Sequence, residues 1–198
     1  RRLASEAGEA ACAEFREGDA MAFDLPADEW GTFDVAHARF ILEHVPEPHA
    51  VVERMARAVR PGGRLVLMDD DHDLLRLWPA APAFLRAYEA YAETYTRLGN
   101  DPHIGRKLPE LLVRAGVKPV RTTWIFYGAP MGHPRFDAMV DNMIGLVAGA
   151  RDALLGHGLL DAHTLEAGLA EMEVWRTQPH ASLWFALAWA EGIREERP

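Results

Sequence analysis

An acidic run follows a short apolar segment in the first half of the chain. The segment 64–68 is typical of a buried strand, and the run 69–73 that follows it holds four carboxylates and a histidine. A strand that only had to end would need one polar residue, so this run forms a solvated turn or faces a positive charge. Clustered carboxylates also suit hard cations, but adjacent strand residues point to opposite faces, so few of these oxygens converge. We therefore expect no metal site here.

The elements around this run alternate between strand and helix. Strands are expected over 11–18, 33–40 and 64–69, and an amphipathic helix is expected over 49–60. The sequence Pro61-Gly62-Gly63 ends this helix and starts the next strand. A strand, a helix and a strand of these lengths form a crossover unit. The sequence therefore predicts a parallel sheet that is covered on both faces.

The second half of the chain is richer in predicted helix. Helices are expected over 74–98, 105–116 and parts of 131–179, and strands over 117–128 and 182–192. No shift in composition marks a domain boundary, so we expect one domain over residues 1–198. The helical stretches are expected to cover one end of the sheet.

The bulk composition excludes several classes of protein. The net charge is −9 and no basic stripe is present, which opposes binding to nucleic acid. No apolar run approaches the roughly 20 residues that a membrane helix needs. The single Cys12 excludes an internal disulfide and a zinc site with several cysteines. It fits a reducing compartment, and we expect a cytoplasmic location.

The expected ligand site lies where the strands end, because ligands of open parallel sheets bind at the carboxyl ends of the strands. Three strand ends are visible, at 18–20, 38–40 and 69–71. They should lie along one acidic edge, beneath helices that are rich in aromatic residues. A cationic ligand with a flat ring would suit this edge.

Three segments carry a resemblance to a known family: EFREGDA (14–20), FDVAHARFILEHVPEP (33–48) and AVRPGGRLVLMDD (58–70). In this order they resemble the middle of a class I S-adenosylmethionine-dependent methyltransferase of the small-molecule type, similar to the ubiquinone and menaquinone biosynthesis group. The resemblance implies an α/β fold with a Rossmann-like, mostly parallel sheet and helical lid insertions. Residues 1–72 would be the cofactor-side core, and residues 73–198 the lid helices, the last helix and the C-terminal strands.

The resemblance also implies cofactor-binding residues. Asp19, between Gly18 and Ala20, matches the acidic residue that accepts a hydrogen bond from the adenine amino group, and the amide of Ala20 would meet the ring. Arg39 and Phe40 match the segment beside the methionine part of S-adenosylmethionine. The alternatives are a simple turn at Asp19 and a surface charge at Arg39.

On the substrate side, the resemblance places Glu43 and His44 near the methyl-transfer position and Asp70 at a strand end that faces the acceptor. Tyr88 and Tyr91 are candidate substrate contacts, although their spacing is equally typical of a packed core. His133 lies in a loop with glycine and proline, where function often resides. His44 and His133 are the candidate catalytic bases for an oxygen or nitrogen acceptor; Asp70 is a third option.

The chain also departs from this family. The glycine-rich loop after the family's first strand, and the acidic residue after its second, would both lie upstream of Arg1. We therefore expect N-terminal strands of the sheet to be missing from residues 1–198. These residues alone should be unstable, aggregate or recruit a strand from a second copy, with a possible homodimer, and should lack activity. The sequence RRLASEAG (1–8) is expected to be the end of a helix that Gly8 closes.

The prediction is S-adenosylmethionine-dependent methylation of a small, partly apolar molecule. One alternative is a non-catalytic, methyltransferase-like scaffold or partner-binding domain. A second is a nicotinamide-dependent oxidoreductase, which would need a G-x-G-x-x-G fingerprint that this sequence lacks.

Overall fold

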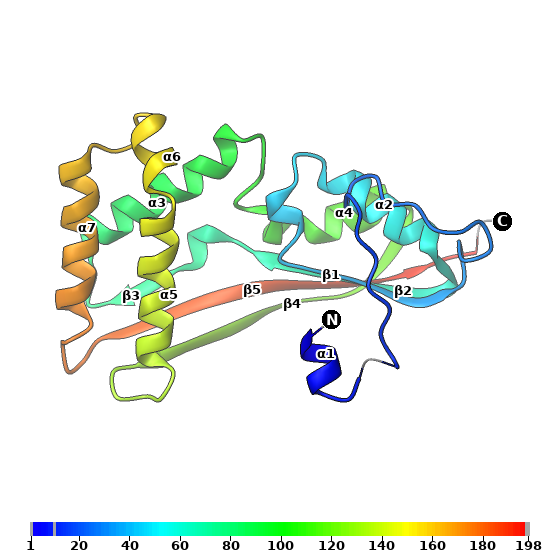
Figure 1. Cartoon of the computed structure of the whole chain (residues 1–198), viewed down its shortest axis with the longest axis horizontal. Coiled ribbons are helices and arrows are strands. Elements are labelled where there is room, and N and C mark those ends of the chain that lie inside the picture. The colour runs from blue at the N-terminus through cyan, green and yellow to red at the C-terminus, as the bar shows by residue number, and fades with distance from the viewer. Residues whose placement is uncertain (1, 10, 197–198) are drawn as a thin grey trace.

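Five strands form one mixed sheet in the computed structural model, which describes residues 2–9 and 11–196 (Figure 1). The strands are β1 (Phe33–Arg39), β2 (Val59–Asp70), β3 (Arg76–Trp78), β4 (Val117–Pro130) and β5 (Ser182–Arg194). β1 and β2 run parallel, and β5 runs antiparallel to β2, β3 and β4. β2 and β3 follow one another along one edge of β5, and β4 pairs with its other edge.

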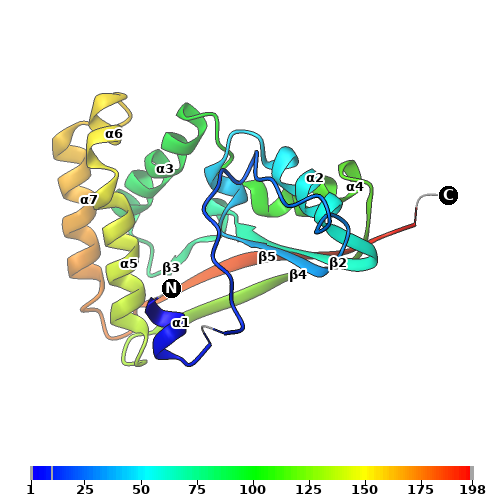
Figure 2. The ribbon, with the colours of Figure 1, turned by 45° about the vertical axis from the view of Figure 1, so that its right-hand side comes forward.

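The larger helices form two groups (Figures 1 and 2). In the first group, α2 (Pro48–Ala58) and α4 (Leu108–Arg114) pack side by side against β1, β2, β4 and β5. The second group gathers at the other end of β5, near β3, and consists of α3 (Pro82–Arg97), α5 (Phe136–Gly149), α6 (Arg151–Gly156) and α7 (Ala162–Trp175). Short 3-10 turns connect the parts: η1 (Leu42–His44), η2 (His72–Leu74) and η3 (Ile104–Lys107).

The amphipathic pattern of the first helix group explains its position. Val51, Val52 and Met55 recur at helical spacing and are buried in a core under α2 and α4. Pro48 opens α2, where its missing amide hydrogen costs nothing. The predicted crossover from β1 through α2 to the parallel β2 is confirmed.

A second core holds the other helix group against β3 and the start of β5. Phe84, Leu165 and Trp175 are among its fully buried side chains. The indole nitrogen of Trp175 also donates a hydrogen bond of 2.6 Å to the carbonyl of Pro79. The two helix groups therefore stand on separate cores, and the carboxyl ends of β1 and β2 lie between them.

Residues 11–18 do not form the predicted strand. Their side chains are exposed, and the guanidinium of Arg16 binds Glu14 within the segment and Glu29 beyond it. The alternating residues suit a strand, but an extended segment becomes a strand only where another edge is free to pair with it. β1, the nearest predicted partner, pairs with β2 alone among the described strands and so keeps one free edge, but residues 11–18 do not form a strand along it. A free edge is therefore necessary but not sufficient.

Other predictions need smaller corrections. The helix expected over 74–98 begins only at Pro82, because residues 76–78 pair with β5 as β3. The sheet is not covered on both faces in the described chain, since Val35 of β1 is 52% exposed. The short helix near the start is confirmed as α1 (Arg2–Glu6), with Gly8 at a φ of +73°, and Arg1 lies outside the described residues.

Candidate active site

A cavity of about 250 Å³ lies where β1 and β2 end and the two helix groups meet. Its walls come from the turn after β1, the end of β2, the turn η2, helices α3 and α5, the end of β4 and the start of β5. The lining is rich in carboxylates and tyrosines: Phe40, Glu43, His44, Asp70, His72, Tyr88, Tyr91, Tyr95, Tyr127, Asn142, Met143, Leu146 and Phe185. Parallel strands bring their carboxyl ends to one edge, so this is the place that the sequence predicted for a ligand.

Asp69 joins the ends of the two parallel strands. Its carboxylate accepts hydrogen bonds from the amides of Leu42 (2.8 Å) and Ile41 (3.2 Å). Burial raises the pKa of Asp69 to about 6, although these amides oppose the shift. The chain turns sharply just before them, at Phe40, whose φ is +52°. The turn and the Asp69 anchor together direct Glu43 into the cavity.

Glu43, His72 and Tyr88 form a buried hydrogen-bonded chain. His72 Nε2 lies 3.0 Å from Glu43 Oε2, and His72 Nδ1 lies 3.0 Å from the Tyr88 hydroxyl. All three residues are buried. Burial holds the pKa of Tyr88 well above its usual range, so the hydroxyl keeps its proton.

Asp70 contributes the acidic end of β2 to the cavity. Its Oδ1 atom is buried and has no hydrogen-bond partner among the described residues. Burial raises the pKa of Asp70 to about 8, and the neighbouring negative charge of Glu43 adds to the shift. The carboxyl group is therefore largely protonated at neutral pH, and it would ionise more readily beside a cation.

Two further tyrosines and a histidine complete the polar wall. The hydroxyls of Tyr91 and Tyr95 lie 2.8 Å apart, and the ring of His44 lies 5.5 Å from that of Tyr95. His44 Nε2 is also 3.3 Å from Glu43 Oε1. Burial raises the pKa of Tyr91 and of Tyr95, so both hydroxyls remain neutral donors and acceptors.

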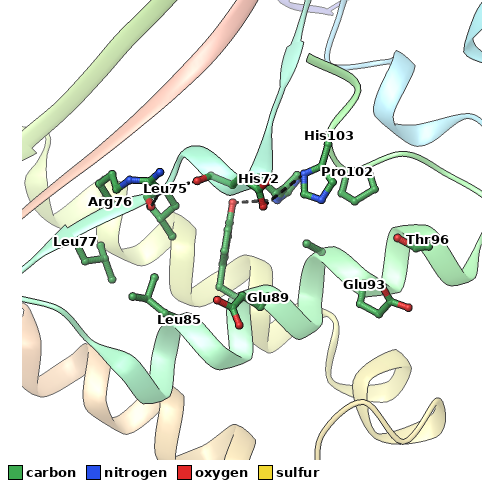
Figure 3. A pocket seen from close by; sticks show the side chains of 13 residues that line it. His72, Leu75, Arg76, Leu77, Leu85, Glu89, Glu93, Thr96, Pro102 and His103 are labelled. Carbon is green, nitrogen blue, oxygen red and sulfur yellow. Dashed lines mark hydrogen bonds and ion pairs between the residues drawn. The ribbon is translucent and has the colours of Figure 1, made fainter. Parts of the chain in front are cut away.

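A larger cavity of about 680 Å³ lies behind His72, between η2 and α3 (Figure 3). Figure 3 shows Glu89 and Glu93 projecting from α3, with His103 across from them beside His72. His72 and Tyr88 line both cavities and so form part of the wall between them.

A family model described as "Methyltransferase domain" matches residues 5–120. The chain belongs to this methyltransferase family. The matched region includes η1, the acidic end of β2 and Tyr88 of α3, all of which contribute to the cavity wall. The resemblance found in the sequence is thereby confirmed.

Curated members of the family match shorter stretches of the chain. The methyltransferase str3 of Strobilurus tenacellus is 34% identical over 85 residues, which is 41% of this chain and 30% of that protein. A demethylmenaquinone methyltransferase of Lactococcus lactis is 35% identical over 78 residues, 39% of this chain and 27% of that protein. A ubiquinone biosynthesis O-methyltransferase of Xanthomonas oryzae is 46% identical over 44 residues, 22% of this chain and 18% of that protein. The matches thus span less than a third of these relatives.

Solved structures of low sequence identity share the fold of this methyltransferase-family chain. The YcgJ protein of Bacillus subtilis aligns with a TM-score of 0.54 at 16% identity, covering 99% of this chain and 76% of that one. The [4+2]-cyclase SpnF aligns with a TM-score of 0.53 at 16% identity, covering 99% of this chain and 62% of that one. The predicted α/β, Rossmann-like fold is confirmed. Within the described part of the chain, no helix is long and apolar enough to cross a membrane.

The methyltransferase-family chain brings five of the predicted site residues to one cavity. They are Phe40, His44, Asp70, Tyr88 and Tyr91. Arg39 is exposed at the end of β1, with its guanidinium carbon 4.9 Å from the centre of the Phe40 ring.

The remaining predicted residues lie elsewhere. Gly18, Asp19 and Ala20 belong to the loop before β1, and the carboxylate of Asp19 accepts a hydrogen bond of 2.8 Å from the amide of Met21. His133 lies in the exposed loop before α5, where its Nδ1 accepts a hydrogen bond of 3.2 Å from the amide of Arg135. It does not line the cavity.

Sequence reasoning did not single out His72, Tyr127 or Phe185 as site residues. His72 was visible as the one non-acidic member of the run 69–73. Tyr127 and Phe185 lie on strands that the sequence predicted, but the hydrophobic pattern did not show which strands pair with them or in which direction they run. Their rings lie 5.9 Å apart on the paired strands β4 and β5.

Two groups of side chains have the ligand types of a metal site. In the first, ligand atoms of Glu43, Asp70 and His72 lie within 4.8 Å of one another. In the second, formed by Asp71, Asp73 and His103, the guanidinium of Arg106 already binds both carboxylates. The second group is therefore an ion-pair cluster. In the first group, the hydrogen bond between Glu43 and His72 already uses one candidate ligand atom of each residue.

Proposed function

We propose that this chain belongs to an enzyme that transfers a methyl group from S-adenosylmethionine to a small, partly apolar molecule. The cavity at the carboxyl ends of β1 and β2 carries this proposal, because it combines an unpartnered carboxyl group with neutral hydroxyls in a member of a methyltransferase family. S-adenosylmethionine would supply a methyl group that is already activated by a positively charged sulfur. The protein's own task is to position the acceptor and manage its proton.

The chain's residues fit such a cofactor on two counts. Asp70 Oδ1 is a buried acceptor without a partner, beside the carboxylate of Glu43, which suits a cationic group. Asp19 is exposed in the loop after Gly18 and could accept from an adenine amino group, with Ala20 beside it. Arg39 and Phe40 would lie beside the methionine part.

An apolar extension of the cavity supports a partly apolar acceptor. A second cavity of about 240 Å³ shares Tyr127, Asn142, Met143 and Phe185 with the first. Its other walls include Met139 and Leu183. An acceptor could place its reactive group among the tyrosines and an apolar arm against these side chains. A homodimer and a cytoplasmic location remain predictions.

Calorimetric titration of the full-length protein with S-adenosylhomocysteine tests the cofactor. Methyl-labelled S-adenosylmethionine with a panel of substituted phenols, alcohols and amines tests the reaction of the same protein. We expect saturable binding and transfer of label to at least one acceptor. Absence of both binding and transfer would leave the non-catalytic scaffold as the better explanation.

A further inference from the structure

Three buried side chains from three separate elements meet at the wall of the cavity. Glu43 comes from η1, His72 from η2 and Tyr88 from α3, and the two hydrogen bonds that link them are each 3.0 Å long. The hydroxyl of Tyr88 has no other hydrogen bond in the described part of the chain, and Tyr88 lines the cavity.

The chemistry of these groups determines the direction of both hydrogen bonds. An ionised Glu43 can only accept, so the proton of a neutral His72 lies on Nε2. His72 Nδ1 is then an acceptor, and the Tyr88 hydroxyl donates to it. Burial holds the pKa of Tyr88 high, in agreement with a protonated hydroxyl. The Tyr88 oxygen keeps a lone pair that no described residue uses, and Tyr88 lines the cavity.

We propose that Tyr88, His72 and Glu43 form a proton relay that serves a hydroxyl acceptor. A hydroxyl group becomes a strong nucleophile only as it loses its proton, whereas a neutral amine can attack through its lone pair without a base. The proposal rests on the methyl-transfer function proposed above. The acceptor hydroxyl would donate to the Tyr88 oxygen. As the acceptor oxygen forms its bond to the methyl carbon, the carbon–sulfur bond breaks and its electron pair stays on sulfur. The acceptor proton passes to Tyr88, and the Tyr88 proton passes to His72 Nδ1. Glu43 stabilises the resulting imidazolium.

The surroundings favour this assignment over the two histidines that the sequence predicted as bases. His133 is outside the cavity, and the side chain of His44 is 51% exposed whereas that of His72 is 4% exposed. Other ionisable groups near the relay are His44, Asp70, Tyr91, Tyr95, Tyr127 and His103. The larger cavity behind His72 (Figure 3) gives solvent a route to remove the proton after the product leaves. In this scheme Tyr88 is the catalytic residue, and His72 and Glu43 position it and hold its proton.

The kinetic test compares Tyr88→Phe with the unsubstituted enzyme, both as full-length protein, on a series of phenols of increasing acidity. We expect kcat to fall about 10²–10⁴-fold for weakly acidic phenols, the usual range for acid–base catalysis, with little change in KM. The loss should shrink as the phenol becomes more acidic, because an ionised acceptor needs no base. His72→Gln should behave likewise. His49→Gln is the matched control, since His49 pairs with Glu53 at 3.3 Å on α2, away from the cavity.

A second measurement needs no turnover. Nitrogen NMR of histidine-labelled protein should find neutral His72 protonated on Nε2, and Glu43→Gln should reduce this preference. An Nδ1-protonated His72 would overturn the relay. So would an equal loss of rate for every phenol in Tyr88→Phe, or transfer to amines with none to hydroxyls; these last two results would leave the methyl-transfer function standing. If no acceptor is methylated and S-adenosylhomocysteine does not bind, the function is refuted and the relay with it.

Discussion

The carboxylate of Asp69 lies 2.8 Å from the amide nitrogen of Leu42 and accepts its hydrogen bond. Asp69 ends the buried part of β2, and Leu42 begins η1 after β1. This contact joins the two parallel strands where they open onto the cavity. Glu43 follows Leu42, and His72 lies three residues after Asp69, so the same contact brings the two ends of the Glu43–His72 hydrogen bond together.

Replacement of Asp69 should therefore weaken both the fold and the site. Asp69→Ala leaves the amides of Ile41 and Leu42 without an acceptor and should lower the free energy of unfolding by about 2–4 kcal/mol. Asp69→Asn should lose less, because its amide oxygen can still accept. Urea unfolding of the two variants measures the difference. Similar small losses for both would show that the contact does not stabilise the turn.

Asp70 should make stability depend on pH. Its pKa is about 8 in the folded chain, so between pH ~4 and ~8 the folded state holds a proton that the unfolded state has lost. The free energy of unfolding should then fall as pH rises through this window. Asp70→Asn lacks this ionisable group and so does not lose this contribution. Its free energy of unfolding minus that of the parent should therefore increase between pH ~5 and pH ~8.5, by on the order of a few kcal/mol. Urea unfolding at both pH values tests this, and a constant difference would contradict it.

Arg106 should stabilise the acidic turn through its two partners. Its guanidinium contacts buried Asp71 at 2.5 and 2.6 Å and Asp73 at 2.6 Å. Arg106→Gln leaves Asp71 without its cation, and we expect a loss of about 1–3 kcal/mol. Arg97→Gln, which removes an exposed pair with Glu93, should cost less than about 0.5 kcal/mol. Thermal or urea unfolding compares them, and equal losses would refute a special role for Arg106.

Gly105 should tolerate no side chain. A Cβ atom there would lie 2.6 Å from the carbonyl oxygen of Asp70 and 3.0 Å from that of Asp69, so η3 packs directly on the acidic strand end. We expect Gly105→Ala to cost about 1–3 kcal/mol and to lower binding of S-adenosylhomocysteine. Gly145→Ala is the control, because nothing lies within 4 Å of a Cβ there and it should stabilise α5 by about 0.5–1 kcal/mol. An unaltered Gly105→Ala variant would show that the strand end can move.

Replacement of Asp19 distinguishes two roles for this residue, a contact with the cofactor and a hydrogen bond within its own loop. If it accepts from the adenine amino group, Asp19→Ala should weaken binding of S-adenosylhomocysteine by about 1.5–3 kcal/mol, the range for a hydrogen bond to a charged group. If it only accepts from the amide of Met21, the affinity should stay the same. Asp24→Ala, in the same loop, is the matched control. Calorimetric titration decides between the two.

The sequence was sufficient for the elements that local pattern determines. The helical spacing of Val51, Val52 and Met55 predicted α2, and the apolar run before Asp69 predicted β2. It was insufficient where a partner decides the structure. Residues 11–18 have a strand-like pattern but do not form a strand beside β1, and residues 76–78 became β3 because β5 pairs with them.

The site residues also divide into those that local pattern predicts and those that depend on contacts between distant segments. The strand ends at Phe40 and Asp70 were predictable, because parallel strands share one carboxyl edge. The Glu43–His72 and His72–Tyr88 hydrogen bonds join residues 29 and 16 positions apart, and no local pattern encodes such a meeting. In the sequence, His133 was as suitable a candidate base as His44, but its loop lies outside the cavity.

The late position of β5 in the chain has a consequence for folding during synthesis. This strand pairs with β2, β3 and β4, yet it is formed by residues 182–194, and the ion pair between Arg64 and Glu191 joins positions 127 residues apart. During synthesis, β2, β3 and β4 leave the ribosome well before their shared neighbour does. Each then carries an unpaired edge that can associate with other nascent chains. Slow translation between residues 130 and 182 should therefore favour aggregation, and the β5 side of the cavity wall can form only after residues 182–194 have emerged.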